Sequence, residues 1–225
     1  MFFFDSTMII LFPAIIISAF AQFKIKASFS KYSKVNSANG YTGSQVARML
    51  LDDGGLFDIA VEIVPGKLTD HYDPSKRVMR LSKEVYNGTS VASIGVAAHE
   101  TGHALQDKEN YVPLRVRNAI VPAVNFSSNA SWLLFIVGII LSIQPLIYIG
   151  IILFSAVVVF QLITLPVEFN ASSRALKILE SRSILYGDEI KGAKSVLTAA
   201  AMTYLAATLM AISQLIRLLL LSRDR

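Results

Sequence analysis

The longest apolar stretch of the chain runs from Asn118 to Val167 and contains no Lys, Arg, Asp, Glu or His. A helix that crosses a membrane needs about 20 apolar residues, so this stretch can hold two crossings. Gln144-Pro145 divides it, and a proline restricts the residue before it and breaks helices. The pattern therefore predicts a transmembrane hairpin at 119–166, with arms at 122–143 and 146–166.

Two further apolar stretches lie near the ends of the chain, at Thr7–Phe23 and Ser195–Ile216. The first resembles either a membrane anchor or a cleaved signal peptide, because Ala19-Phe20-Ala21 matches the small-residue pattern of a cleavage site. Signal peptides begin with positive charge, whereas this chain carries Asp5 before the stretch and its lysines after it. We predict a retained transmembrane anchor at 1–23 and a transmembrane or interfacial helix at 195–225.

Basic residues outside the apolar stretches indicate the orientation of the chain. They follow the first stretch and flank the hairpin on both sides: Lys24, Lys26, Lys31, Lys34, Arg115, Arg117, Arg174, Lys177, Arg182, Lys191 and Lys194. Segments rich in Lys and Arg stay in the cytoplasm, so 24–118 and 167–194 are predicted to face the cytoplasm of a cell membrane that the chain crosses several times. Arg217, Arg223 and Arg225 oppose a full crossing by the last stretch, which leaves open whether it spans or folds back along the interface.

The more polar segment at 24–118 has the signals of a small α+β domain. Residues 24–38 are polar and basic and are predicted to form a linker. Thr42 and Gln45 have the spacing of a helix capping box, and Ser90 is a typical residue before a helix. The predicted elements are a helix at 43–52, strands at 59–64 and 77–82, and a helix at 90–107. The fold class is mostly α and integral to the membrane, with about four transmembrane helices beside this domain.

Composition narrows the function classes. Hydrophobic residues make up 53% of the 225 residues and charged residues only 16%, against about 25% charged in average globular proteins. The absence of cysteine excludes disulfide scaffolds, thiolate metal sites and cysteine nucleophiles. The net charge of +5 lies beside apolar stretches, so it indicates contact with a lipid bilayer and not with nucleic acid.

The predicted helix at 90–107 carries the strongest chemical signal, His99-Glu100-Thr101-Gly102-His103. Two histidines at i and i+4 lie on one helical face, so both imidazoles can bind one metal ion. A catalytic zinc site has three protein ligands and leaves one position for water, whose pKa the metal lowers toward about 7. Glu100 is the candidate general base, which takes a proton from the water and returns it to the leaving amine. The motif also arises by chance, but two of the three histidines of this chain belong to it.

The third metal ligand must come from elsewhere in the chain. The candidates are His71, Glu109, Glu168 and several aspartates. Glu168 follows the predicted hairpin directly, and a hairpin returns the chain to the side that it left. The topology therefore favours Glu168, although a carboxylate at this point can also mark the N-terminus of a helix.

The chain resembles a known family of membrane proteases. His99-Glu100-Thr101-Gly102-His103 followed by Glu168-Phe169-Asn170-Ala171-Ser172 is similar to the zincins related to the CAAX-prenyl and heat-shock membrane proteases. With the stretches 70–74, 81–88, 98–106 and 165–172, it resembles the YugP-type neutral zinc metallopeptidases of bacteria more closely. The resemblance implies a zincin-like domain at 24–118, a helix with the third zinc ligand, Glu168, at 167–194, and one zinc ion per chain.

Further residues are candidates for supporting roles at the site. Ser172 stands where the wider zincins have an aspartate, and we predict that Ser172 and Asn170 contact the ligands from outside. His71 and Arg174 are candidates to stabilise the oxyanion or hold the substrate, and Tyr72, Tyr86 and Tyr111 are further ones. The strand at 77–82 is a candidate edge to which an extended peptide adds.

These observations favour a membrane zinc metalloendopeptidase that acts on peptides or on soluble or membrane proteins. An intramembrane protease of the site-2 type is disfavoured, because its metal motif lies inside a long apolar span, whereas Asp107, Lys108 and Glu109 follow His103 within about a turn of helix. A membrane scaffold that binds zinc without catalysis, an assembly factor and a small channel are the alternatives. The intact Glu100 disfavours the scaffold, since a structural zinc site needs no base.

Overall fold

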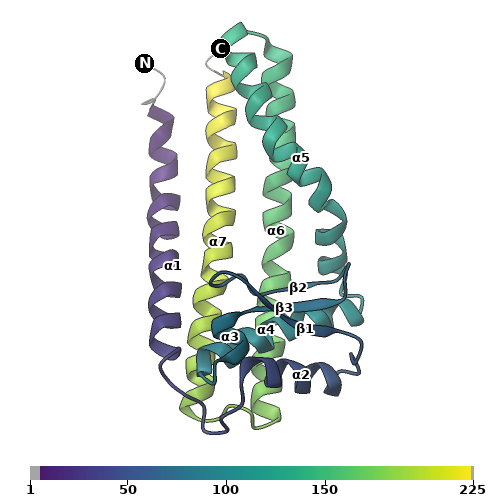
Figure 1. The fold of residues 1–225 in the computed structure, drawn as a ribbon. Coiled ribbons are helices and arrows are strands. Elements are labelled where there is room, and N and C mark those ends of the chain that lie inside the picture. The colour runs from purple at the N-terminus through teal and green to yellow at the C-terminus, as the bar shows by residue number, and fades with distance from the viewer. Residues whose placement is uncertain (1–5, 224–225) are drawn as a thin grey trace. The chain divides into compact units, whose positions relative to one another are not determined.

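A computed structural model describes residues 6–223 of the chain. Four of the described helices are long and apolar enough to cross a membrane (Figure 1). They are α1 (Leu11–Tyr32), which follows the short 3-10 helix η1 (Ser6–Ile10), and α5 (Val112–Leu141), α6 (Gln144–Ser181) and α7 (Asp188–Arg223). A small three-stranded sheet and three shorter helices complete a fold that is mostly α with a small α+β part, as the sequence predicts.

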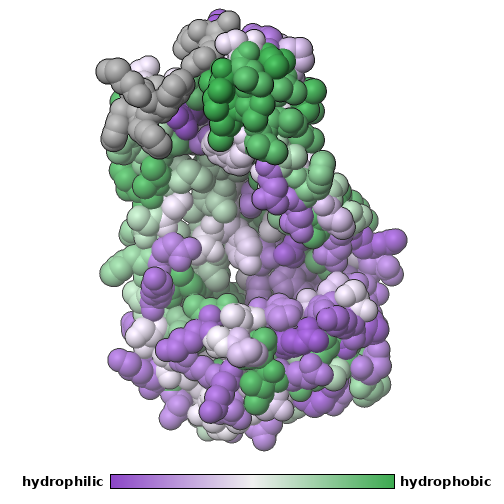
Figure 2. Space-filling view, turned by 45° about the horizontal axis from the view of Figure 1, so that its top comes forward, coloured by the Kyte–Doolittle hydropathy of each residue, from purple (hydrophilic) through white to green (hydrophobic). Residues whose placement is uncertain are grey.

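The chain forms two compact units, and α1, α6 and α7 each pass from one to the other. Unit 1 contains the described residues of 1–22 and 203–225, together with 115–166, and unit 2 contains 23–114 and 167–202. Unit 1 is a set of helices whose core consists of Phe135, Ile147, Ile151, Phe154, Val158, Ala211 and Leu218. Unit 2 holds the sheet and the predicted chemistry, and Figure 2 shows hydrophilic side chains gathered over its strands and short helices.

The predicted hairpin consists of α5 and the first part of α6. Gly138 lies against the backbone of Ile147, and Gly150 lies against the backbone of Ser131 and Phe135, so small residues let the two helices approach closely. The turn falls at residues 142 and 143, where Ser142 has a φ of 54°. The turn was expected at Gln144-Pro145, but these residues begin α6. Proline is accepted in the first turn of a helix, because the backbone N–H groups there have no acceptor within the helix.

The sheet of unit 2 has the order β1-β3-β2, with β1 (Ala60–Val64), β2 (His71–Asp73) and β3 (Val78–Ser82). β1 pairs parallel to β3, and β2 pairs antiparallel to its other side. The predicted strand at 77–82 is therefore the central strand, and both of its edges already have backbone partners. The prediction that a peptide adds to this strand is wrong. The sequence predicts no strand at β2, since three residues are too few to show an alternating pattern.

Two capped helices pack beside the sheet in unit 2. Thr42 begins α2 (Gly43–Asp53) with the complete capping box that the sequence predicts, and Ser90 begins α4 (Val91–Lys108) by accepting from the N–H of Ser93. The short helix α3 (Lys83–Asn87) connects β3 to α4. The core between these elements includes Leu51, Ile59, Met79, Leu81, Val85 and Ala97.

α4 is held against α6 by a close backbone approach. A Cβ atom at Gly102 would lie 2.6 Å from the carbonyl oxygen of Ala171, so only glycine fits there. One turn toward the start of α4, Ala98 belongs to a core cluster that also contains Ala175 and Leu179 of α6. The contact places the second half of α4, with its two histidines, beside residues 167–175 of α6.

The expected linker at 24–38 is wrong, because α1 continues to Tyr32. Its lysines are exposed, whereas Ser28, Phe29 and Tyr32 are buried or half-buried on one helical face. Ser28 Oγ lies 3.0 Å from Ser195 Oγ of α7, and the ring of Tyr32 contacts Gly192. The helix is therefore maintained by packing on α7, which its polar composition does not indicate.

Candidate metal centre

α4 and α6 bring three candidate ligand side chains together inside unit 2. His99 and His103 lie one turn apart on α4, and Glu168 comes from α6. His99 Nε2 lies 3.3 Å from Glu168 Oε2, and His103 Nε2 lies 3.6 Å from the same oxygen. The three ligand atoms lie within 4.8 Å of one another, and the Glu168 side chain is only 2% exposed. The arrangement is a buried, convergent set of two imidazoles and one carboxylate.

The outer nitrogens of both imidazoles have partners. His103 Nδ1 lies 3.0 Å from Gln106 Oε1, and His99 Nδ1 lies 3.1 Å from Ser172 Oγ. The amide oxygen of Gln106 can only accept, so His103 carries its proton on Nδ1 and presents the lone pair of Nε2 to the centre. Ser172 thus lies where it can orient His99, although it replaces a longer aspartate of the wider zincins.

The donor set fits zinc by chemistry and spacing. Two ligand atoms that are each about 2 Å from a tetrahedral ion are separated by about 3.3 Å. The two separations between histidine nitrogen and carboxylate oxygen are 3.3 and 3.6 Å. Two imidazoles and one carboxylate leave a fourth position for water or substrate, as in catalytic zinc sites. His99, His103 and Glu168 can therefore hold zinc.

The negative charges of Glu100 and Glu168 also favour a cation beside His103. Burial lowers the pKa of His103, but the hydrogen bond with Glu168 and the charges of Glu100 and Glu168 outweigh it, so the pKa is raised above its usual value. The two carboxylates thus stabilise positive charge at this point. A metal ion competes with protons for the same imidazole, so metal binding weakens as the pH falls.

Glu100 is buried beside the two histidines and is held by the sheet. Its Oε2 accepts a hydrogen bond from the backbone N–H of Tyr72 in β2, at 3.1 Å. Tyr72 in turn donates its hydroxyl to Asp107 of α4 at 2.9 Å, and its pKa is raised by burial and by this bond. β2 is therefore fastened to α4 at two points and fixes one oxygen of Glu100.

A half-buried carboxyl group, that of Asp70, interacts with the charge of Glu100 in the same unit. Asp70 precedes β2 and accepts from the N–H and the hydroxyl of Ser82, at 2.7 and 3.0 Å. Burial raises the pKa of Asp70 despite these bonds, and the charge of Glu100 contributes to the rise. Its role is to join the start of β2 to the end of β3. The one signal in the sequence was its place in the stretch 70–74, which resembles the family.

Sequence reasoning missed Gln106, which links the two helices of the site. Its Nε2 donates to the carbonyl oxygen of Val167 at 2.8 Å and to Asn170 Oδ1 at 2.9 Å, while its Oε1 faces His103. The side chain is completely buried. The available signal was its spacing, one helical turn after His103. Asn170 acts on His103 through Gln106 and not directly.

The predicted oxyanion residues have other partners. His71 is exposed in β2, and its Nδ1 lies 2.8 Å from the carbonyl oxygen of Thr69. Arg174 donates to Asn170 Oδ1 at 2.7 Å and pairs with Glu109 at 2.7 Å, which lowers the pKa of Glu109. Glu109, which is a candidate ligand by its sequence, therefore forms an ion pair with Arg174. An oxyanion role for His71 or Arg174 stays a prediction.

Replacing Gln106 with leucine is expected to weaken zinc binding about 10- to 100-fold, the usual cost of losing a partner of a metal ligand. The change leaves His103 Nδ1, the carbonyl of Val167 and Asn170 without the bonds that Gln106 makes. Competition with a chromophoric chelator measures the affinity. Thr101→Val is the matched control, since Thr101 is also fully buried on α4 but donates only to Ala97. An equal loss in both variants would contradict the role of Gln106.

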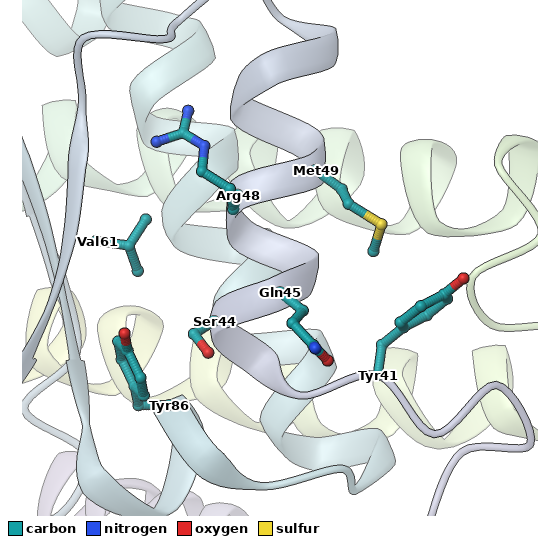
Figure 3. A pocket seen from close by; sticks show the side chains of 7 residues that line it. All are labelled: Tyr41, Ser44, Gln45, Arg48, Met49, Val61 and Tyr86. Atoms are coloured by element: carbon teal, nitrogen blue, oxygen red, sulfur yellow. The ribbon is translucent and has the colours of Figure 1, made fainter.

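Unit 2 also contains a cavity of about 480 Å³, which lies around α2. Tyr86 and Val61 lie on one side of the helix, and Met49 and Tyr41 lie on the other (Figure 3). Its one cation, Arg48, already donates to the carbonyl oxygens of Ile59 and Leu56 and pairs with Asp52. Of the predicted site residues, its lining includes Tyr86 but neither Glu100 nor any of the three candidate ligands, and we assign it no ligand.

The chain is similar to known proteins over most of its length. A family model described as "Putative neutral zinc metallopeptidase" matches residues 7–223. The chain is 53% identical over 205 residues to "Putative membrane protease YugP" of Bacillus subtilis (strain 168), and the match covers 91% of each chain. No solved structure matches. The family match includes both helices that carry the three ligand side chains. The chain therefore belongs to the family described as "Putative neutral zinc metallopeptidase".

Proposed function

We propose that the protein is a membrane zinc metalloendopeptidase, in which His99, His103 and Glu168 hold one zinc ion and Glu100 is the general base. The observation that carries the proposal is the convergence of two Nε2 atoms and one carboxylate oxygen within 4.8 Å. A base directly after the first ligand distinguishes this site from a structural one, which uses four protein ligands and no base.

A bound zinc ion supplies a Lewis acid for the scissile carbonyl and makes water more acidic. Glu100 accepts the proton of the attacking water and then delivers it to the leaving amine. The Tyr72 N–H holds Glu100 Oε2, which leaves Oε1 for this proton transfer. Gln106 and Ser172 keep the outer nitrogens of the imidazoles engaged, so that both Nε2 atoms remain directed at the ion.

The substrate of the proposed enzyme is a peptide or a protein, including membrane proteins that present a segment near the bilayer. Four helices long and apolar enough to cross a membrane support a location in a cell membrane, in line with the description of the Bacillus subtilis relative as a membrane protease. Lysine and arginine residues flank the apolar stretches in the segments 24–34, 115–117 and 174–194. By the positive-inside rule, the proposed active site faces the cytoplasm.

Removal of zinc tests the proposal directly. The full chain, purified in nonionic detergent, is expected to contain one zinc ion per chain and to cleave an unfolded protein substrate. A strong chelator should abolish cleavage, and added zinc should restore it. Metal content is measured by mass spectrometry and cleavage by the appearance of new amino termini. Cleavage that persists without metal would refute the proposed zinc-dependent peptidase. Tightly bound zinc without cleavage would favour a membrane scaffold that binds zinc without catalysis.

A further inference from the structure

A groove of about 510 Å³ lies between α6 and α7 in unit 2. Apolar side chains from both helices line it, among them Phe169, Leu176, Leu197 and Ala201. Phe169 is 49% exposed although it is a large aromatic residue. The metal centre does not use these side chains, so the groove needs a separate explanation.

Cationic side chains line the same groove. Lys177 of α6 and Lys194 of α7 are exposed, and neither forms an ion pair within residues 6–223. A third lysine, Lys191, pairs with Asp188, and the one acidic lining residue is Glu180. The lysines of the lining outnumber its one carboxylate, and two ammonium groups without an ion pair beside an apolar surface indicate a ligand with an anionic head and an apolar tail.

The groove crosses the point where both helices change from polar to apolar sequence. Lys194 is the last charged residue before the apolar stretch 195–216, and Leu197 and Ala201 lie inside that stretch. On α6, Phe169 follows the end of the charge-free stretch 118–167 closely, and Lys177 lies two turns later. In a helix that crosses a bilayer, such a change of sequence marks the level of the lipid headgroups.

The groove is also separate from the position of a substrate at the metal. Ser172 lines the groove, and its Oγ lies 3.1 Å from His99 Nδ1. The other ring nitrogen, Nε2, faces Glu168 at 3.3 Å. Because the two nitrogens point to different sides of the imidazole ring, a molecule in the groove meets Ser172 and lies behind His99. A peptide bond under attack lies on the opposite side.

We propose that this groove binds one anionic phospholipid of the membrane. The phosphate lies between Lys177 and Lys194, and an acyl chain lies along Phe169, Leu197 and Ala201. Charge complementarity selects an anionic headgroup over a zwitterionic one, and the apolar lining selects a lipid over free phosphate. Binding of the lipid does not depend on whether the protein is a peptidase.

The test uses the full chain in nonionic detergent and a phosphatidylglycerol with a photoreactive group on one acyl chain. Mass spectrometry then locates the cross-linked residues, and titration gives the affinity. We expect cross-links on the groove residues of α6 and α7. Lys177→Gln combined with Lys194→Gln should weaken the affinity roughly 30-fold, from the usual contribution of two lysines to binding an anionic lipid.

The matched control is Lys26→Gln combined with Lys34→Gln, which removes the same charge from exposed lysines that follow the first apolar stretch. This control should retain the affinity, and Thr198→Trp, which fills the groove without removing charge, should lose the cross-links. Three results would overturn the proposal. The first is an equal loss of lipid affinity in the control variant, and the second is equal labelling by photoreactive phosphatidylcholine and phosphatidylglycerol. The third is displacement of the lipid by glycerol 3-phosphate or by a peptide substrate at low concentration.

Discussion

Replacing Glu168 with alanine is expected to remove zinc from the protein, with a loss of affinity greater than about 100-fold. The carboxylate is the one anionic ligand of the site, and its Oε2 lies within 3.6 Å of both Nε2 atoms. Two imidazoles on one helix bind zinc much less tightly than the complete set. Metal analysis after dialysis measures the zinc content, and circular dichroism checks that the helices persist.

Glu109→Ala is the control that discriminates between candidate ligands. Glu109 was the other glutamate that the sequence offered as a ligand, and the structure pairs it with Arg174 at 2.7 Å. This variant is expected to keep its zinc. Equal zinc content in Glu168→Ala and in the wild-type protein would refute the proposed ligand set and return the third position to His71 or an aspartate.

Replacing Glu100 with glutamine is expected to keep the zinc and to lower the rate of peptide hydrolysis by about 100- to 10,000-fold, the usual contribution of a general base. The amide has nearly the same shape, and its oxygen can still accept from the Tyr72 N–H. It cannot take a proton from water, so the change acts on chemistry and leaves the fold intact. Zinc content and turnover number are measured on the same preparation.

Glu84→Gln serves as the control for loss of a carboxylate, since Glu84 is exposed on α3 and lies outside the metal centre. Its turnover should equal that of the wild-type protein. Unchanged turnover in Glu100→Gln would eliminate the proposed base. Loss of zinc from Glu100→Gln would instead make Glu100 a ligand, which contradicts the arrangement proposed here.

Local signals in the sequence predicted several elements well. The capping box of Thr42 and the cap at Ser90 are contacts within one helical turn, so the residues that form them are neighbours in the sequence. Apolar runs long enough to cross a bilayer likewise need no tertiary information. The spacing of His99 and His103 is also a local signal, because one helix places both side chains on one face.

Elements that depend on distant partners were predicted less well. The end of α1 carries lysines and looks like a linker, yet Tyr32 and Ser28 pack on α7. β2 has only three residues, and its pairing with β3 is decided by the sheet. Gln106 has no chemical signal of its own, and its importance depends on Val167 and Asn170, which lie on another helix.

The amino-acid sequence by itself determined the apolar helices, the motif with Glu100 and the two histidines, and a short list of possible third ligands. Only the tertiary structure decided which carboxylate meets the imidazoles and what holds them. The physical reason is the close packing of α4 on α6, where Gly102 lets the helix approach the carbonyl of Ala171. That contact joins segments far apart in the chain, and no local pattern of residues encodes their distance.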